Sequence, residues 1–247
     1  MKVYSKTDVG LVREKNEDSI LLKSPKLFAV ADGVGGFEGG EIASKMALEI
    51  LDKVTEKYLN ENQPPSYALR KAVSEANAYV YAEGQKKYEH LGMGTTLTAV
   101  YIEDRQTAHV VQIGDSRLYR FRSGHLEQIT CDQTLVNELL TAGKITEGEA
   151  KIHPQKNWLS QALGSESIVQ ADVSKIDIEQ DDVLLLCSDG LSDMVSDRDI
   201  EEILRTFAKE KYADKLVERA LQNGGKDNVS VIVLTDLDKE DGHGNNN

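Results

Sequence analysis

The sequence predicts an α+β fold in which antiparallel β-sheets are stacked and paired helices lie on their outer faces. Short β-branched runs follow one another through connections of two to four residues, such as Ser123-Gly124 and residues 103–106. Connections this short join strands that run antiparallel. Long amphipathic segments interrupt these runs as pairs, and helices of this kind cover a sheet from the outside.

The expected strands are mostly short, and their apolar residues change period along the chain. Seven are expected before residue 130, at residues 3–7, 19–22, 27–31, 95–102, 108–113, 118–121 and 126–129. Three more are expected at residues 168–176, 183–187 and 229–235. Strands joined by the short connections should pair as antiparallel neighbours.

The first pair of helices is expected at residues 41–59 and 66–87, each with an apolar stripe that should face a sheet. The stripes are Ile42, Met46, Ile50 and Val54 in the first helix, and Leu69, Val73, Ala76 and Val80 in the second. Shorter helices are expected at residues 134–142, 197–208 and 213–223.

The composition fits one globular domain. A chain of 247 residues with 40% apolar and 29% charged residues can bury one sizeable core. We expect a single domain over residues 1–235 and a disordered polar tail over residues 236–247. Without a heptad seam or a second domain, a monomer is expected.

Charge and cysteine usage exclude several function classes. The net charge of −13 opposes a nucleic-acid partner. The chain has neither an apolar run long enough to cross a bilayer nor an apolar signal segment at its start, so we expect a cytoplasmic protein without a membrane partner. Cys131 and Cys187 are expected to be reduced, mostly buried thiols.

The segment FAVADGVGGFEGGEIASKMA, residues 28–47, joins an apolar run to a helix through five glycines. A strand, a glycine loop and a helix in this order are the context of a dinucleotide-binding site. The next convincing strand begins only near residue 95, too late for a βαβ unit, and the loop lacks GKS or GKT. A nucleotide-binding site in this segment is therefore disfavoured.

A second interpretation starts from aspartates at the ends of expected strands. Asp32, Asp115 and Asp189 each follow a β-like run, and Asp227 precedes one. Each alone is most simply a turn residue, but side chains fixed at four strand ends can converge on hard cations. Because no His or Cys cluster competes, oxygen ligation favours Mg²⁺ or Mn²⁺.

Arg13, in GLVREKNEDSI, adds a cation to this acidic set. Its planar guanidinium is well shaped to hold a phosphate through two parallel hydrogen bonds. On the residues alone, a solvated surface arginine remains the alternative.

Six motifs, in this order, resemble those of the metal-dependent protein phosphatase 2C family, especially its bacterial single-domain members. They are VREKNED at 12–18, VADGVGG at 30–36, GMGTT at 92–96, IGDSR at 113–117, LLCSDGLSD at 185–193 and GGKDNVSVIV at 224–233. The resemblance implies a four-layer α-β-β-α sandwich, with two central antiparallel sheets flanked by antiparallel helices. It also implies hydrolysis of phosphoserine and phosphothreonine in cytoplasmic proteins, opposing a bacterial Ser/Thr kinase.

The resemblance further implies a two-metal site that binds Mn²⁺ or Mg²⁺. Asp32 would bridge the two ions. The carbonyl of Gly33 and, through water, Glu17 would serve one ion, and Asp189 and Asp227 would hold the other. A glycine at position 33 is expected because a ligating carbonyl needs backbone freedom and space around the ion.

Three further roles follow from the same resemblance. Arg13 would grip the phosphoryl oxygens, and Asp18 would orient the water that the metals activate for attack on phosphorus. A third, weaker cation would take Asp115, Asp189 and Asp193.

Three positions depart from the family pattern. Many relatives have a histidine near the DG pair, where this chain has Val34 and Phe37, and a histidine where it has Gln133. One such histidine is a proposed general acid. Here His153 is a candidate, within residues 141–160, which resemble the family's mobile flap and have an exposed, adjustable composition.

Two rival functions remain open on the sequence. A catalytically weak or dead phosphatase-like module would bind phosphoproteins or transmit a signal, and the missing histidines favour it. A phosphatase for small metabolites would use the same metal site. The intact aspartates favour an active enzyme over the first rival, and an assay on a phosphoprotein would distinguish the second.

Overall fold

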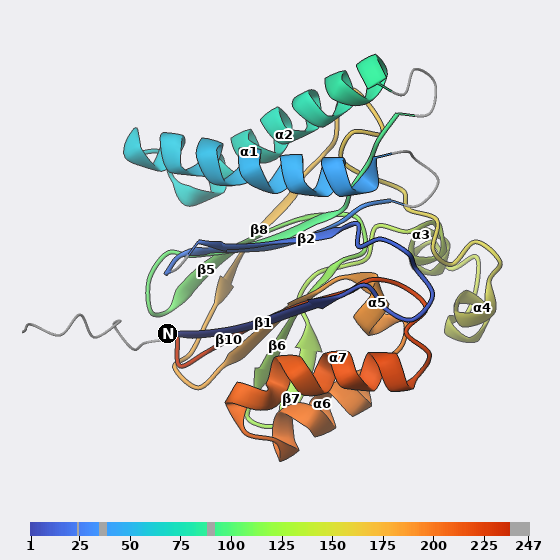
Figure 1. The fold of residues 1–247 in the computed structure, drawn as a ribbon. Helices are drawn as coiled ribbons and strands as arrows, with labels where there is room; N and C mark the ends of the chain where they lie inside the picture. The colour runs from blue at the N-terminus through green and yellow to red at the C-terminus, as the bar shows by residue number, and fades with distance from the viewer. Residues whose placement is uncertain (24, 35–38, 88–91, 238–247) are drawn as a thin grey trace, which may run out of the picture.

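A computed structural model describes residues 1–237 except 24, 35–38 and 88–91. These residues form four layers: two helices, a sheet, a second sheet and two further helices (Figure 1). The sandwich expected from the sequence is therefore confirmed.

Both sheets have five strands, and all their pairings are antiparallel. The first sheet has the order β2 (Asp18–Lys23), β3 (Leu27–Asp32), β4 (Leu97–Ile102), β5 (Thr107–Ile113) and β8 (Asp172–Asp177). The second has the order β1 (Lys2–Asp8), β10 (Val229–Thr235), β9 (Val183–Cys187), β6 (Arg117–Arg122) and β7 (His125–Gln128).

The long helices lie on the outer faces of the two sheets (Figure 1). Helices α1 (Gly40–Asn60) and α2 (Pro65–Lys87) cover the first sheet, and α6 (Asp197–Thr206) and α7 (Tyr212–Gln222) cover the second. Between them in the chain come the short helices α3 (Leu135–Thr141), α4 (Glu147–Ile152) and α5 (Asp189–Ser192) and the 3₁₀ turn Lys209–Lys211.

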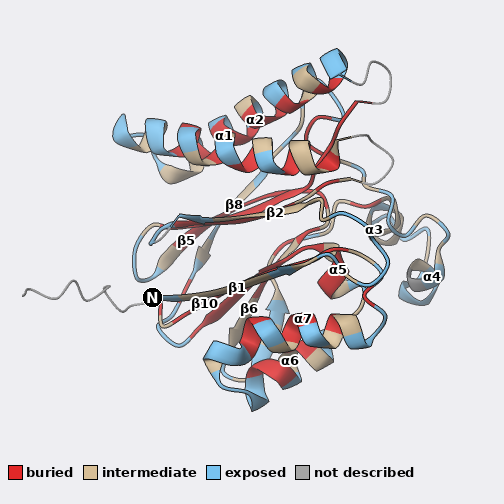
Figure 2. Ribbon diagram, in the orientation of Figure 1, coloured by how far each residue is buried: buried red, intermediate tan, exposed pale blue. Residues whose placement is uncertain are grey.

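Successive side chains point to opposite faces of each strand, so the buried apolar residues form three separate layers. In β3, Ala29 and Ala31 pack under the helices, whereas Phe28 and Val30 face the other sheet. In β10, the odd-numbered valines pack under the second helical layer, and Ile232 joins the layer between the sheets. Buried residues accordingly run through both sheets and along the helix faces turned toward them (Figure 2).

The buried face of α1 differs from the predicted stripe. Val54 is buried, but Ile42, Met46 and Ile50 are only partly buried at the edge of the core. The fully buried line runs through alanines such as Ala47, because α1 packs against both α2 and the sheet. Small side chains permit that close approach and contribute little to a hydropathy pattern. The predicted stripe of α2 is confirmed, since all four residues are buried.

Several boundaries also differ from the expectations. Strand β8 begins only at Asp172, and Thr95 forms isolated bridges to Gly33 and Leu163 rather than starting β4. Leu237, expected in the disordered tail, is buried between the sheets, while residues 238–247 lie outside the described residues.

The two cysteines differ from each other. Both are free, as expected, but Cys131 is exposed and only Cys187 is buried. Cys131 follows the end of β7 in an irregular segment, so no strand face carries its thiol into the core. Among the described helices, none is long and apolar enough to cross a bilayer.

Candidate active site

The strand-end acids meet at one end of the sandwich, where the two sheets open toward solvent. A cavity of about 180 Å³ lies there. It is lined by seven of the nine expected site residues, namely Arg13, Glu17, Asp32, Gly33, Asp115, Asp189 and Asp227. Asp193 lines an adjoining cavity of about 310 Å³ that shares Asp115 and Asp189. The sequence motifs therefore converge on one place although they are spread over the chain.

Asp18 lines neither cavity but is Asp32's direct partner across the β2–β3 ladder. The Ser188 hydroxyl, from the other sheet, donates to Asp18 Oδ2 at 2.7 Å. Asp18 Oδ1 is buried and has no hydrogen-bond partner in the structure. A buried, unpaired carboxylate oxygen is costly, so this atom indicates a missing polar partner such as an ordered water.

The acids of the site are poorly neutralised by the protein itself. Burial raises the pKa of Asp18 to about 6 and the pKa of Asp115 to about 7. Burial and the surrounding aspartates raise the pKa of Asp32 and Asp189 well above the usual range. Burial, with Glu41 close by, also raises the pKa of Glu17. Such shifts follow when carboxylates are brought together without enough positive charge.

This donor set fits hard divalent cations. Its oxygens come from carboxylates and a backbone carbonyl, the ligands that Mg²⁺ and Mn²⁺ prefer. Among the residues that the structure describes, no three His, Cys, Asp or Glu side chains stand close enough to form a ready metal site. Like charges repel at short range, and a bound cation is what would allow the carboxylates to draw together.

Arg13 is held at the mouth of the cavity by one of the acids. Its Nη2 donates to Asp227 Oδ2 at 2.7 Å, and both side chains remain partly exposed. This contact raises the pKa of Arg13. The guanidinium is thus anchored beside the acids and open to solvent, a position from which it can reach a bound anion.

Asn228 is a site residue that sequence reasoning missed. Its Nδ2 donates to the carbonyls of Val9 and Lys15 at 3.0 and 2.8 Å, and its Oδ1 accepts from the Glu17 amide at 2.8 Å. This buried side chain ties the loop that carries Arg13 and Glu17 to the start of β10. The only sequence signal was its place beside Asp227 in GGKDN.

The glycine at position 33 is explained by packing. Its φ lies outside the left-handed region, contrary to the expected need for unusual backbone freedom. A Cβ there would lie 2.6 Å from the carbonyl carbon of Gly40, the first residue of α1. Gly190 is equally constrained, because a Cβ would lie within van der Waals overlap of the Asn228 carbonyl. Both glycines let helices approach the acid-bearing strand ends.

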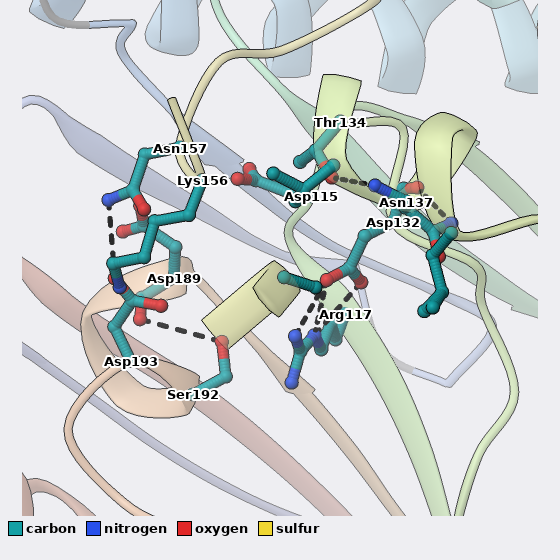
Figure 3. Close-up of a pocket in the computed structure, with 13 residues that line it drawn as sticks. Asp115, Arg117, Asp132, Thr134, Asn137, Lys156, Asn157, Asp189, Ser192 and Asp193 are labelled. Carbon is teal, nitrogen blue, oxygen red and sulfur yellow. Dashed lines mark hydrogen bonds and ion pairs between the residues drawn. The ribbon is translucent and has the colours of Figure 1, made fainter. Parts of the chain in front are cut away.

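The adjoining cavity lies between α5 and the expected flap (Figure 3). From the flap, Lys156 Nζ and Asn157 Nδ2 donate to Asp193 Oδ2 at 3.0 and 3.2 Å. On the opposite wall, Arg117 holds Asp132 through its Nε and Nη2 atoms. A cation bound to Asp193 would therefore compete with the two flap donors.

The flap contains a helix that its composition did not suggest. Helix α4 begins after Thr146, whose side chain and that of Glu149 form a reciprocal capping box. The spacing Thr-x-x-Glu was the sequence signal for it. His153, the candidate acid, lines neither cavity in the structure, and its Nδ1 accepts from the Gln155 amide.

The three positions that depart from the family pattern have different surroundings. Val34 lines the smaller cavity, whereas Phe37 lies outside the described residues. The Gln133 side chain accepts from the Gly114 amide at 2.8 Å, next to Asp115. Gln133 therefore helps to hold the turn that carries Asp115, a role that its identity alone did not reveal.

Comparison with known proteins supports the resemblance, and the family match includes the first five of the six motifs. The model of the family protein phosphatase 2C matches residues 12–223. The serine/threonine protein phosphatase PstP of Mycobacterium tuberculosis is 39% identical over 98% of this chain and 46% of its own length. The serine/threonine phosphatase stp of Listeria monocytogenes is 37% identical over 95% of each chain. The chain thus spans about half of the mycobacterial relative and nearly all of the listerial one.

Solved structures agree in fold as well as sequence. The crystal structure of the M. tuberculosis phosphatase PstP/Ppp matches with a TM-score of 0.84 and 38% identity, covering 94% of this chain and 97% of that one. The catalytic domain of PstP in complex with two manganese ions matches with a TM-score of 0.81 and 37% identity, covering 94% and 96%. Motifs, fold and strand-end acids lead to one conclusion: this chain belongs to the protein phosphatase 2C family.

Proposed function

We propose that the chain hydrolyses phosphoserine and phosphothreonine in proteins with two bound Mn²⁺ or Mg²⁺ ions, and that it reverses the action of a Ser/Thr kinase. One observation carries the proposal: partly buried aspartates from both sheets gather around one cavity with more negative charge than Arg13 can neutralise. The similarity to named Ser/Thr phosphatases and to a manganese-bound catalytic domain supports it.

Asp32, the Gly33 carbonyl, Glu17, Asp189 and Asp227 would hold the two ions. Divalent cations at such a site lower the pKa of water and neutralise phosphoryl charge. A third ion would use Asp115, Asp189 and Asp193 and would have to displace the flap donors from Asp193.

The protein's own groups bind and orient the substrate. Arg13 donates to the phosphoryl oxygens from the mouth of the cavity, where Asp227 already fixes its guanidinium. Asp18, fixed through Oδ2 by Ser188, accepts a hydrogen bond from a water through Oδ1 and thereby orients it. No histidine is among the described residues that line the cavity, and we infer that the leaving oxygen would take its proton from a water or from another acid.

Metal removal and restoration test the proposal. The protein would be stripped with EDTA, titrated with Mn²⁺ or Mg²⁺, and assayed for phosphate release from a phosphothreonine protein and from p-nitrophenyl phosphate. We expect turnover of both substrates to return with metal. Arg13→Ala should raise KM for both by about 10- to 100-fold, the value of one or two charge-assisted hydrogen bonds, and Arg13→Lys should recover part of the loss.

Two outcomes would contradict the proposal. Folded protein that binds Mn²⁺ but hydrolyses neither substrate would favour a phosphoprotein-binding module. Turnover of p-nitrophenyl phosphate without any turnover of phosphoproteins would favour a phosphatase for small metabolites.

A further inference from the structure

Several exposed apolar side chains lie close in sequence to residues that line the cavity. In the described part of the chain, the large apolar side chains classed as exposed are Val9, Leu11, Val12, Leu22, Tyr67, Tyr79, Ile152, Trp158, Ile168 and Phe207. Five of these ten lie in two short segments, residues 9–12 and 152–158. Both segments adjoin residues of the cavity lining, Arg13 on one side and Asn157 on the other.

Leu11 and Val12 are the two that adjoin each other in sequence, and they directly precede Arg13. Their exposed fractions are 67% and 65%. Single exposed apolar residues are ordinary on protein surfaces. Two in a row, directly before the arginine proposed to hold phosphate, form a small exposed apolar pair, which we call the rim.

The backbone beneath this rim is held in place. The Leu11 amide donates to the Gly225 carbonyl at 2.7 Å, and the Gly10 amide donates to Asp8 Oδ1 at 2.9 Å. Asn228 holds the carbonyls of Val9 and Lys15 on either side. Because the loop is already ordered, little conformational entropy is lost when another molecule packs against it.

We propose that Leu11 and Val12 bind an apolar side chain of the phosphoprotein substrate, within about two residues of the phosphorylated one. This inference rests on the proposed function, because Arg13 must hold the phosphate. An extended chain advances roughly 3.3–3.6 Å per residue, so neighbours of a phosphoresidue bound at Arg13 come within reach of the rim. The net charge of −13 disfavours acidic flanking residues, and the rim itself offers no charge to attract them.

Peptide kinetics test the rim. A phosphothreonine peptide with an alanine background would carry one leucine, placed in turn at each of the two positions before and after the phosphothreonine. With metal-loaded wild-type protein we expect the best leucine position to raise kcat/KM about three- to tenfold, the value of one partly buried apolar side chain. The double variant Leu11→Ser/Val12→Ser should abolish this gain and leave turnover of p-nitrophenyl phosphate unchanged.

Two further variants make the result specific. Leu11 Cγ lies only 3.0 Å from where a Cβ on Gly225 would stand, so Leu11 has a packing role as well. Val12→Ser alone removes half of the rim without that risk and should remove part of the gain. Ile168→Ser changes an apolar residue that is 79% exposed and lines neither cavity, and it should keep the full leucine gain.

The outcomes separate this inference from the proposed function. If the peptides are hydrolysed but leucine does not raise kcat/KM, the proposed role of the rim is wrong and the proposed phosphatase activity still stands. The same holds if the rise in kcat/KM persists in both rim variants. Turnover of no phosphopeptide at all would overturn the proposed function and the rim with it.

Discussion

The buried Asp182 and the partly buried acids of the cavity have opposite surroundings in this molecule. At the end of the sandwich away from the cavity, Asp182 is 1% exposed and receives Arg122 Nε and Nη2, each at 2.7 Å, and the Glu179 amide at 2.8 Å. At the cavity end, no lysine or arginine among the described residues is paired with Asp32 or Asp189.

This difference distinguishes acids that stabilise the fold from acids that indicate a binding site. A buried carboxylate that the chain itself satisfies contributes to the fold, and its loss should cost stability. Partly buried carboxylates that the chain leaves without cations make the metal-free fold less stable, and they indicate a candidate binding site. The two groups should therefore respond to the same substitution in opposite ways.

The largest expected effect is on activity at Asp32. Asp32→Asn keeps the shape of the side chain but removes its charge, so the site would lose the ligand proposed to bridge the two ions. We expect kcat/KM for p-nitrophenyl phosphate with saturating Mn²⁺ to fall by at least about 1,000-fold, the scale of losing a group that stabilises charge in an active site. The melting temperature of the metal-free protein should be unchanged or higher, because a buried charge has been removed.

The same change at Asp182, at the other end of the sandwich, should lower stability and leave activity unchanged. Asp182→Asn leaves Arg122 without its bidentate partner, and breaking such a pair costs about 3 kcal/mol of unfolding free energy. Urea denaturation should show this loss, while kcat of the protein that remains folded stays at the wild-type value. Asp177→Asn, at a side chain that is 75% exposed, is the matched control and should cost no more than about 1 kcal/mol. Equal stability losses at positions 177 and 182 would contradict the distinction.

The smallest expected change is in the pH dependence of the melting temperature. It depends directly on the pKa values of the cavity acids. The pKa of Asp18 is raised to about 6 and that of Asp115 to about 7, so the folded protein keeps protons that the unfolded chain, with aspartate pKa values near 3.9, has released. Stability gained from these groups is present at low pH and is lost as the pH rises from about 4 to about 7.

Thermal melts with and without metal measure this effect. The melting temperature of EDTA-treated protein should fall by about 5 °C between pH 5 and pH 8, and saturating Mn²⁺ should remove most of the fall. A metal-free melting temperature that rises over this range would show that the cavity acids are not held in their protonated form by the fold.

The sequence predicted the layers and the site because both depend on local signals. Short connections and paired helices predicted stacked antiparallel sheets, and the resemblance carried by the six motifs predicted the two central sheets and the acids of the site. The sequence did not reveal Asn228 or Gln133 as supports of the site, because their roles depend on backbone groups of segments far apart in the chain. The true face of α1 was missed because it mixes Leu48 and Leu51 with small residues such as Ala47, which carry a weak hydropathy signal.

The position of the acids on two different sheets has a consequence for ion choice. Asp32 ends a strand of the first sheet, and Asp189 follows a strand of the second. The span between their carboxylates is therefore set by the side chains packed between the sheets, among them Val30, Leu186 and Ile232. Because a close-packed interior transmits changes of even one methylene group, substitutions in this hydrophobic layer would shift the two carboxylates relative to each other. The choice among divalent ions at the proposed metal site would then depend partly on residues that never touch an ion.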